Sequence, residues 1–444
     1  MSDDLLARLQ AAESAEERDW LVTEALLESL PAELRQAAWA AAVPHWFDAG
    51  ILAALLEKPP EACDALHAEL QALPFVEPFE VRDGHNVHEV TRTAMLEKLW
   101  SEHRDEYRNL SRRAAACFGG SDEAETRIEE IYHLLIADPD AGADALYDQG
   151  WEWHNSPNFA YDLVYALAGA ALEHAAAGRL DRQGMGAANL LAGTIDTLYS
   201  RNQEAMDRLE AAWQASDAGS QLRAGSTYRL GDVHRMLAEY AQARERYEEA
   251  RALYAATGDR LGEANCIQAL GDVHRMVAEY AAARERYEEA RPIYAAIGAR
   301  MGEANCIQAL GDVHYMLDEY AAARERYEEA RPIYAAIGSR LGEANCLLGL
   351  GDVARAEEDW PEAERLFGAA LAAYREIGMP YNTGLALRRL GGTAEDKGDR
   401  VAAVRYYEEA MEIYERIGVK DAEWLRADLA RVRGGSRGLA VSLD

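Results

Sequence analysis

A stretch rich in chemically active side chains, GEANCIQALGDVH, occurs twice in the 444-residue sequence, at 262–274 and at 302–314. It contains cysteine, histidine, asparagine and aspartate, which are side chains that ligate metals, act as nucleophiles or hydrogen-bond to peptides. The two copies lie 40 residues apart, and GDV recurs at the same interval from Gly231 to Gly351. The pattern therefore indicates either a chemical site used twice or a structural unit used many times.

Cysteine and histidine each return at one position of this unit, as Cys266, Cys306, Cys346 and as His234, His274, His314. Packed helices lie about 8–10 Å apart. A disulfide needs Cα atoms within about 7 Å, and a zinc ion needs ligands that converge at about 2 Å. We therefore expect buried free thiols, histidines that pack between helices, and no metal or cofactor.

Motifs of catalytic sites are absent from the sequence. It contains no Gly-x-Ser-x-Gly, no HExxH, no catalytic Cys–His signature and no GxxxxGK[ST] phosphate loop. Carboxylates are abundant, but abundance on a solvated helix face does not indicate an acid–base pair. We expect a protein that is not an enzyme.

The composition favours helices, because alanine, leucine, glutamate and arginine dominate. The net charge of −32 and the isoelectric point of about 4.7 repel nucleic acid and anionic membranes and attract basic partners. No apolar run reaches the roughly 18 residues of a membrane span, and the acidic start lacks a signal-peptide core. The five cysteines form no CxxC pair, so we expect a soluble cytoplasmic protein.

Each 40-residue unit reads as two helices. GEANCIQALGDVHRMVAEY gives the first, and AAARERYEEARPIYAAIG gives the second, which is closed by Gly298. Ala283, Tyr287, Ala290 and Tyr294 are spaced by three and four residues, so they form one apolar stripe on the second helix. A period of this length indicates a solenoid of helix pairs.

The pattern L-G-x₈-Y-x₂-A-x₃-Y-x₂-A resembles the signature of the tetratricopeptide repeat (TPR), with matches at Leu270, Gly271, Tyr280, Ala283, Tyr287 and Ala290. The 40-residue length is similar to that of the long-helix subclass of kinesin light chain and the Pins family. The resemblance implies an all-α protein with a right-handed TPR superhelical solenoid. We expect degenerate TPR-like pairs over 119–220, a TPR array with a capping helix over 221–433, and a flexible tail over 434–444.

The region 1–118 lacks the repeat and is expected to be a winged-helix-like domain. Residues 75–79, Val81 and Val87 flank a turn at Asp83-Gly84 and predict a short two-stranded wing, followed by a helix near His88. This order resembles the winged-helix domain of the STAND/NB-ARC signalling ATPases. The resemblance places His88 and Glu89 where that family contacts nucleotide, with Glu in place of Asp. Without a phosphate loop, an ATPase core is absent from this sequence.

If the TPR register holds, the first helix of each unit lines a concave groove that binds a partner. The resemblance assigns to this groove Tyr228, Asp232, Arg235, Asn265, Gln268, Asp272, Arg275, Asn305, Gln308, Asp312, Tyr315, Asn345, Asp352 and Arg355. Asparagine suits the backbone of an extended peptide because it donates and accepts, and aspartate suits basic side chains. The alternative is that these residues only cap or bridge neighbouring repeats.

The sequence thus predicts a protein–protein interaction module that binds a protein or peptide with a basic segment. By resemblance it is the sensor or adaptor subunit of a bacterial signalling or defence complex, with an effector or ATPase subunit in trans. Two other classes remain open, namely a scaffold that spaces two partners and a winged-helix transcriptional regulator. The region 1–118 has 22 acidic and 11 basic residues, which argues against contacts with DNA phosphates.

Overall fold

The protein is all-helical apart from one pair of strands. The computed structural model describes residues 3–12, 14–154 and 160–434, which form 23 helices and two strands. The chain divides into two compact units, residues 1–233 (unit 1) and 234–444 (unit 2). The expected fold class, an all-α protein with a TPR solenoid, is confirmed. The tail expected at 434–444 lies outside the described residues, except for Gly434.

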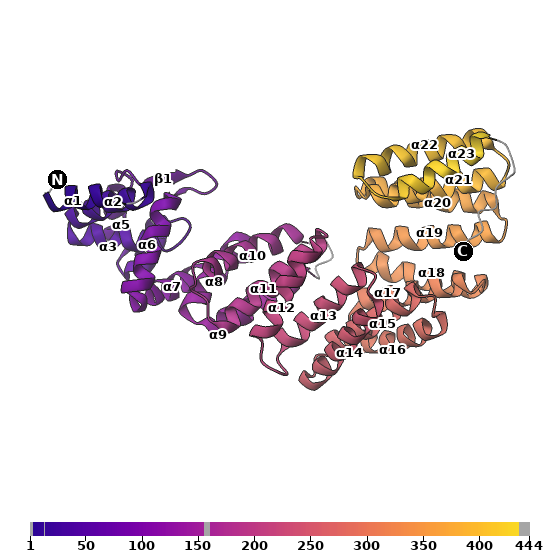
Figure 1. Cartoon of the computed structure of the whole chain (residues 1–444), viewed down its shortest axis with the longest axis horizontal. Helices are drawn as coiled ribbons and strands as arrows, with labels where there is room; N and C mark the ends of the chain where they lie inside the picture. Colours follow the sequence, from indigo (N-terminus) through magenta and orange to yellow (C-terminus); the bar gives the residue numbers. More distant parts are fainter. Residues whose placement is uncertain (1–2, 13, 155–159, 435–444) are drawn as a thin grey trace. The chain divides into compact units, whose positions relative to one another are not determined.

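Unit 1 begins with short helices around a hairpin and continues as helix pairs (Figure 1). Its elements are α1 (Asp3–Ala11), α2 (Ala15–Ser29), α3 (Ala32–Ala41), α4 (Ala49–Leu56), α5 (Pro60–Leu70), β1 (Val76–Phe79), β2 (Gly84–Val87), α6 (Glu89–Glu102), α7 (Arg104–Phe118), α8 (Ala124–Ala137), α9 (Pro139–His154), α10 (Tyr161–Ala176), α11 (Arg182–Leu198), α12 (Asn202–Ala215) and most of α13 (Gln221–Met236).

The expected two-stranded wing is present in unit 1. Strands β1 and β2 pair antiparallel, with Val76 opposite Val87 and Phe79 opposite Gly84. The backbone N–H groups of Phe47 and His85 donate to each other's carbonyls at 2.7 and 2.9 Å, which ties the hairpin to the segment before α4. The next helix starts directly after the exposed His88, as the sequence predicts.

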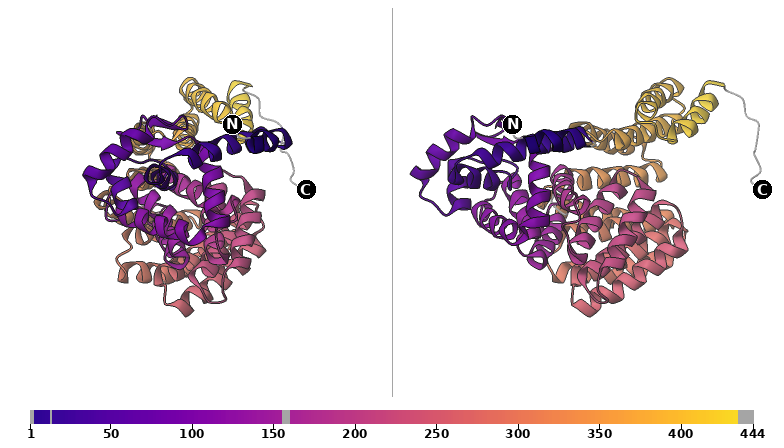
Figure 2. Two further views of the ribbon diagram at one scale, coloured as in Figure 1. Left: turned by 90° about the vertical axis from the view of Figure 1, so that its left-hand side faces the viewer. Right: turned by 60° about the vertical axis from the view of Figure 1, so that its left-hand side comes forward.

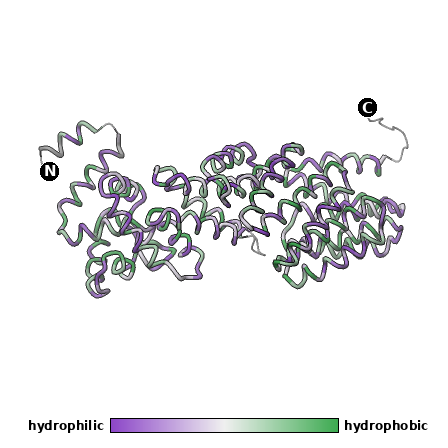
Figure 3. Tube along the Cα trace, turned by 90° about the horizontal axis from the view of Figure 1, so that it is seen from below, coloured by the Kyte–Doolittle hydropathy of each residue, from purple (hydrophilic) through white to green (hydrophobic). Residues whose placement is uncertain are grey.

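Unit 2 consists of antiparallel helices in which each packs on the next in the chain (Figures 1 and 2). They are α14 (Tyr240–Thr257), α15 (Arg260–Met276), α16 (Tyr280–Ala296), α17 (Arg300–Met316), α18 (Tyr320–Ala336), α19 (Arg340–Ala356), α20 (Trp360–Glu376), α21 (Pro380–Asp396), α22 (Arg400–Ile417) and α23 (Asp421–Gly434). Hydrophobic and hydrophilic stretches alternate along the helical trace in Figure 3, as amphipathic helices require.

Tyrosine rings packed on glycines hold the helices of unit 2 together. The buried ring of Tyr287 on α16 lies over Gly271 of α15, where an added Cβ would be 2.7 Å from its Cε1 atom. The next tyrosine of α16, Tyr294, covers Gly302 at the start of α17. One tyrosine therefore closes the contact within a repeat and the other closes the contact between repeats.

The expectations for cysteine and histidine can be checked in the repeat. Cys266, Cys306 and Cys346 are fully buried free thiols, as expected, and burial raises the pKa of Cys346 to about 12. The repeat histidines are half-buried, and each contacts the glutamate five residues later, as in the 2.6 Å contact between His274 Nδ1 and Glu279. This contact, which the sequence did not predict, joins the end of one helix to the start of the next.

The described residues hold neither a candidate metal site nor a candidate membrane span. Within them, no group of three or more His, Cys, Asp or Glu side chains has the geometry of a metal site. No helix among the described residues is both long enough and apolar enough to cross a membrane.

The tyrosine–glycine contact leads to a stability prediction. Gly271→Ala should lower the urea midpoint followed by circular dichroism, because the new methyl overlaps the Tyr287 ring; overpacking costs about 1–3 kcal/mol. Gly368→Ala, in the middle of α20, is the matched control, because its Cβ would meet no atom within 4 Å. The control should be neutral or stabilising by up to about 1 kcal/mol. Equal midpoints for the two variants would contradict this account of the packing.

Candidate functional site

The first helices of successive repeats in unit 2 lie on the same side of the array. Helices α15 and α17, α17 and α19, and α19 and α21 contact each other directly, whereas the second helices of neighbouring repeats make fewer contacts. On each first helix the polar residues are spaced by three and four positions and share one face. We call the following set the polar face: Asn265, Gln268, Asp272, Asn305, Gln308, Asp312, Asn345 and Asp352.

Buried tyrosines orient the amides of the polar face. The Tyr294 hydroxyl lies 2.7 Å from Asn265 Oδ1 and 3.0 Å from Gln268 Oε1. Tyr334 repeats these two contacts with the next repeat's amides at the same distances, and Tyr374 donates to Asn345 Oδ1 at 2.8 Å. The amide oxygens therefore already accept hydrogen bonds from within the protein.

The amide nitrogens are placed differently from the oxygens. In the part of the chain that the structure describes, the side-chain nitrogens of Asn305 and Asn345 have no hydrogen-bond partner. They are also not among the buried polar atoms that lack a partner, so they face solvent. Because the oxygen is held by tyrosine, each amide presents its N–H donors outward. Such a row can donate to carbonyl groups of a bound chain.

The carboxylates of the polar face have different partners from repeat to repeat. Tyr287 donates to Asp272 at 2.7 Å, and Tyr327 donates to Asp312 at 2.8 Å. Asp352 instead lies 2.8 Å from the guanidinium of Arg389 on α21. Burial raises the pKa of Asp312 to about 6, even though Arg275 and the Tyr327 hydroxyl favour its ionised form.

The remaining residues assigned to the groove are held by neighbours. Arg275 approaches Asp272 at 3.9 Å. Arg355 pairs with Asp396 of the next repeat at 2.6 Å, so bridging between repeats does occur in this column. The other contacts are those of Arg235 with the Tyr247 hydroxyl at 3.2 Å, Tyr315 with the Tyr320 ring at 5.8 Å between centroids, and Asp232 with Arg229 at 3.0 Å. Tyr228 and the buried Asp232 lie on α13 in unit 1.

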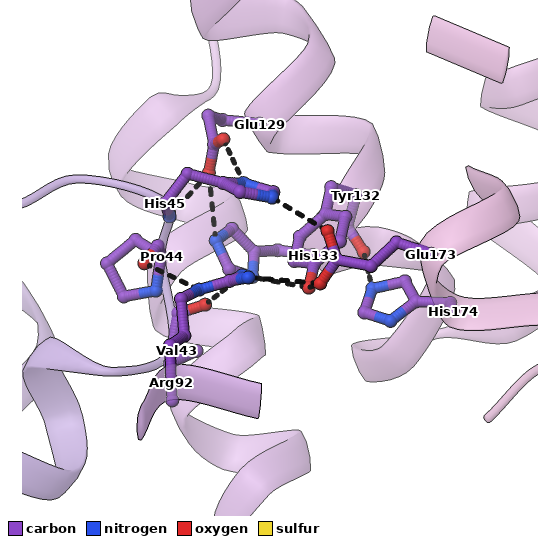
Figure 4. A network of polar contacts seen from close by, with 9 residues as sticks. All are labelled: Val43, Pro44, His45, Arg92, Glu129, Tyr132, His133, Glu173 and His174. Carbon is purple, nitrogen blue, oxygen red and sulfur yellow. Dashed lines mark hydrogen bonds and ion pairs between the residues drawn. The ribbon is translucent and has the colours of Figure 1, made fainter. Parts of the chain in front are cut away.

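A second polar cluster, which the sequence analysis missed, is buried in unit 1 (Figure 4). His45 contacts Glu129 through Nδ1 and Glu173 through Nε2, the latter at 2.9 Å. Arg92 lies 3.0 Å from the same Glu173, which also accepts a 2.6 Å bond from the Tyr132 hydroxyl. This buried network joins α6 and the segment after α3 to α8 and α10.

The charges of the buried network balance. Burial opposes ionisation of His45, but the attraction of Glu129 outweighs it and raises the histidine pKa. His45 and Arg92 in turn hold the pKa values of both glutamates below their usual range despite burial. Two cations therefore face two anions. These contacts link α6 and the segment after α3 to α8 and α10, so we interpret the cluster as a structural link within unit 1.

No local pattern in the sequence could have revealed this network. Its members come from four separate segments, and His45 and Glu173 are 128 positions apart. Only packing of the segment after α3 and of α6 against α8 and α10 brings them together. The polar face, in contrast, repeats at a fixed interval and is visible in the sequence.

Comparisons with known proteins agree with the helical repeat seen in the structure. The tetratricopeptide repeat family model matches residues 223–296 and 342–416. A search of curated proteins gave no significant sequence match. The structure of a signal transduction ATPase with numerous domains (STAND) with a tetratricopeptide repeat sensor, from Pyrococcus horikoshii, is similar at a TM-score of 0.65 and 12% identity. The similarity covers 97% of this chain and 64% of that one, so this chain spans less than two thirds of its length.

A further similar structure is that of a Rap protein in complex with competence and sporulation factor. The TM-score is 0.49 and the identity 10%, over 77% of this chain and 96% of that one. Taken together with the repeat geometry, the family match shows that this chain contains tetratricopeptide repeats, and the similarity to the STAND protein extends the fold match over nearly the whole chain.

The buried network leads to a second prediction. Glu129→Gln should destabilise unit 1 by about 1–3 kcal/mol, because it removes the main counter-charge of the half-buried His45. The measurement is urea unfolding followed by the fluorescence of tryptophans in unit 1.

The matched control removes an exposed glutamate that is also ion-paired. Glu376 pairs with Arg340 at 2.6 Å, and both side chains are more than half exposed. Glu376→Gln should change stability by less than about 1 kcal/mol. If the two variants unfold at the same urea concentration as the parent, the buried network does not fasten unit 1.

Proposed function

We propose that this protein is a non-enzymatic interaction subunit whose polar face binds an extended protein segment with basic side chains. The observation that carries the proposal is the pair of outward amide donors on α17 and α19, each fixed by a tyrosine hydroxyl. Donors held in advance lose little conformational freedom on binding, and preorganisation of this kind favours affinity. A chain laid across the repeats would offer its carbonyls to them.

Charge supports a basic segment. The protein carries a net charge of −32, and one carboxylate of the polar face, Asp312, has no ion pair within 4 Å among the described residues. Asp312 has Tyr315 three residues later, where Asp272 has Arg275, although the charge of Arg275 also acts on Asp312. A lysine or arginine of the ligand would find its counter-ion there, beside an aromatic ring that favours cations.

The role in a larger system is inferred from the domain order. A wing-containing region followed by tetratricopeptide repeats is what this chain shares in fold with a longer STAND protein described as having a TPR sensor. We place this chain as a sensor or adaptor in a bacterial signalling or defence complex that also holds an effector or ATPase subunit. A scaffold that spaces two partners is the alternative.

The direct test is replacement of two asparagines of the polar face. Asn305→Ala with Asn345→Ala should weaken binding of an arginine-containing peptide, selected on the parent from a displayed random library, by roughly tenfold or more. Each lost bond contributes about 0.5–1.5 kcal/mol. The fold should survive, because Tyr334 keeps its 3.0 Å contact with Gln308, and Tyr374 keeps a hydrogen bond with Asn382.

Asn109→Ala, at an exposed position on α7, is the matched control and should bind the peptide as the parent does. Circular dichroism of all three proteins establishes that they are folded. Unchanged peptide affinity in the double variant would show that the polar face does not bind the peptide.

Acidity should weaken the same interaction. The pKa of Asp312 is about 6, so its carboxylate is charged above this pH and neutral below it. Affinity for the basic peptide should therefore fall between about pH 7 and pH 5, and Asp312→Asn should remove most of this dependence and flatten the salt dependence. The control is Asp272→Asn, which should keep the drop near pH 6. A pH profile unaffected by Asp312→Asn would place the basic contact elsewhere.

A further inference from the structure

A row of exposed apolar side chains lies on a different part of unit 2, at the turns between the two helices of successive repeats. Each of three turns presents a pair, with the following exposed fractions: Met236 41% and Leu237 43%, Met276 46% and Val277 37%, Met316 54% and Leu317 38%. We call these six residues the turn ridge. Large apolar side chains that repeat on a surface mark interaction sites more often than scattered ones do, and methionine suits adaptable contacts.

The fold itself does not require the turn ridge to be apolar. The next repeat has Ala356-Glu357 at the corresponding positions and forms the same turn. The residue that follows each pair has the same left-handed backbone, with φ of 59° at Ala278 and 62° at Glu358. The array therefore tolerates a small and a charged residue here, so internal packing does not explain the apolar pairs.

The spacing of the pairs matches an α-helix. Because α15 and α17 contact each other side by side, equivalent turns follow one another along one edge at steps of about 10 Å. Seven residues of an α-helix advance about 10.5 Å. A helix laid along this edge with apolar residues repeated every seven positions would meet one pair after another.

The number of charged residues differs between the two ends of the turn ridge. Beyond Met316 and Leu317 the turns carry more carboxylates than the earlier ones, with five exposed acidic residues: Asp318, Glu319, Glu357, Glu358 and Asp359. Within 4 Å, the basic side chains that face them are His314 against Glu319 and Arg324 against Glu357. At the other end, alanines occupy the positions that correspond to Asp318. Every turn of the ridge also carries an exposed glutamate, namely Glu239, Glu279 or Glu319, so the end beyond Met316 and Leu317 is the more acidic of the two because of its additional carboxylates.

We propose that the turn ridge docks an amphipathic helix of a partner protein, with apolar residues at seven-residue intervals and lysines or arginines at the end that lies over Asp318 to Asp359. The apolar face covers the three pairs, and the basic end sets the orientation. This surface is separate from the polar face, so the protein can hold a helix at its edge while an extended segment occupies the first helices. The inference does not depend on the proposed function.

The probe is a fluorescein-labelled synthetic helix of about 20 residues, with leucine pairs repeated every seven positions and lysines at one end. A control peptide has the same composition, with its leucines distributed around all faces. Fluorescence anisotropy with the full chain should show the patterned peptide binding at least about tenfold more tightly than the control. Equal affinity for both peptides, or no binding of the patterned peptide at about 100 μM, overturns the proposal.

The variant that tests the ridge copies the next repeat. Met276→Ala, Val277→Glu, Met316→Ala and Leu317→Glu together introduce the Ala-Glu pair that the fold already accommodates, so the protein should remain folded by circular dichroism. Affinity for the patterned peptide should fall by about tenfold or more, although the added glutamates attract its lysines. Val401→Glu, at an 83% exposed site on α22, is the matched control and should bind as the parent does.

The orientation of the bound helix and the identity of the molecule that occupies the turn ridge are tested separately. Glu358→Gln with Asp359→Asn should weaken binding of the lysine-ended peptide and reduce its salt dependence, because screening acts on the charged contact. Light scattering of the parent should show a monomer at micromolar concentration. If the parent is a dimer that the ridge variant converts to a monomer, a second copy of the chain occupies this edge, and a partner helix does not.

Discussion

Unit 2 depends on one recurring contact, the packing of a tyrosine ring on a glycine. The tyrosine hydroxyl emerges on the other side of this contact. The Tyr294 ring fills the contact with Gly302 at the start of α17. Its hydroxyl reaches back to Asn265 and Gln268 on α15. A phenylalanine would preserve the volume but not the hydrogen bonds, and a larger residue at the glycine would separate the helices. The same side chain therefore closes the core and orients the polar face. The proposed binding surface cannot become mobile unless the packing of the repeat also loosens.

Differences between otherwise similar repeats carry most of the functional information. The near-copies share the packing residues, so a position that changes while the helices stay in place is free of the packing constraint. Tyr315 stands where Asp272's repeat has Arg275, so Asp312 has no cation three residues later in its own helix. Glu357 in place of leucine ends the turn ridge. Both departures concern exposed or half-buried side chains, as expected for surfaces shaped by a ligand more than by the core.

Unit 1 is held by a different kind of interaction. The repeats rely on apolar contacts between neighbours, whereas the wing-containing part is joined to α8 and α10 by the buried network around His45, Arg92 and Glu173. Buried charges of this kind depend on all their partners being present, because the low-dielectric interior penalises any charge left alone. The junction is therefore specific in geometry and sensitive to single substitutions. A substitution at a contact between repeats changes the stability in smaller steps.

The sequence by itself determined the helical repeat, the wing, the buried thiols of the repeat and the columns of polar residues. A 40-residue period fixes which residues face the neighbouring helix, because every copy must bury the same stripe. Tertiary structure decided the rest. It showed that the asparagine oxygens are taken by Tyr294, Tyr334 and Tyr374, which lie 29 positions away in sequence. It also assembled the network of His45 with Glu129 and Glu173, because side chains from four separate segments meet only when those segments pack, and no periodic constraint on the sequence records that meeting.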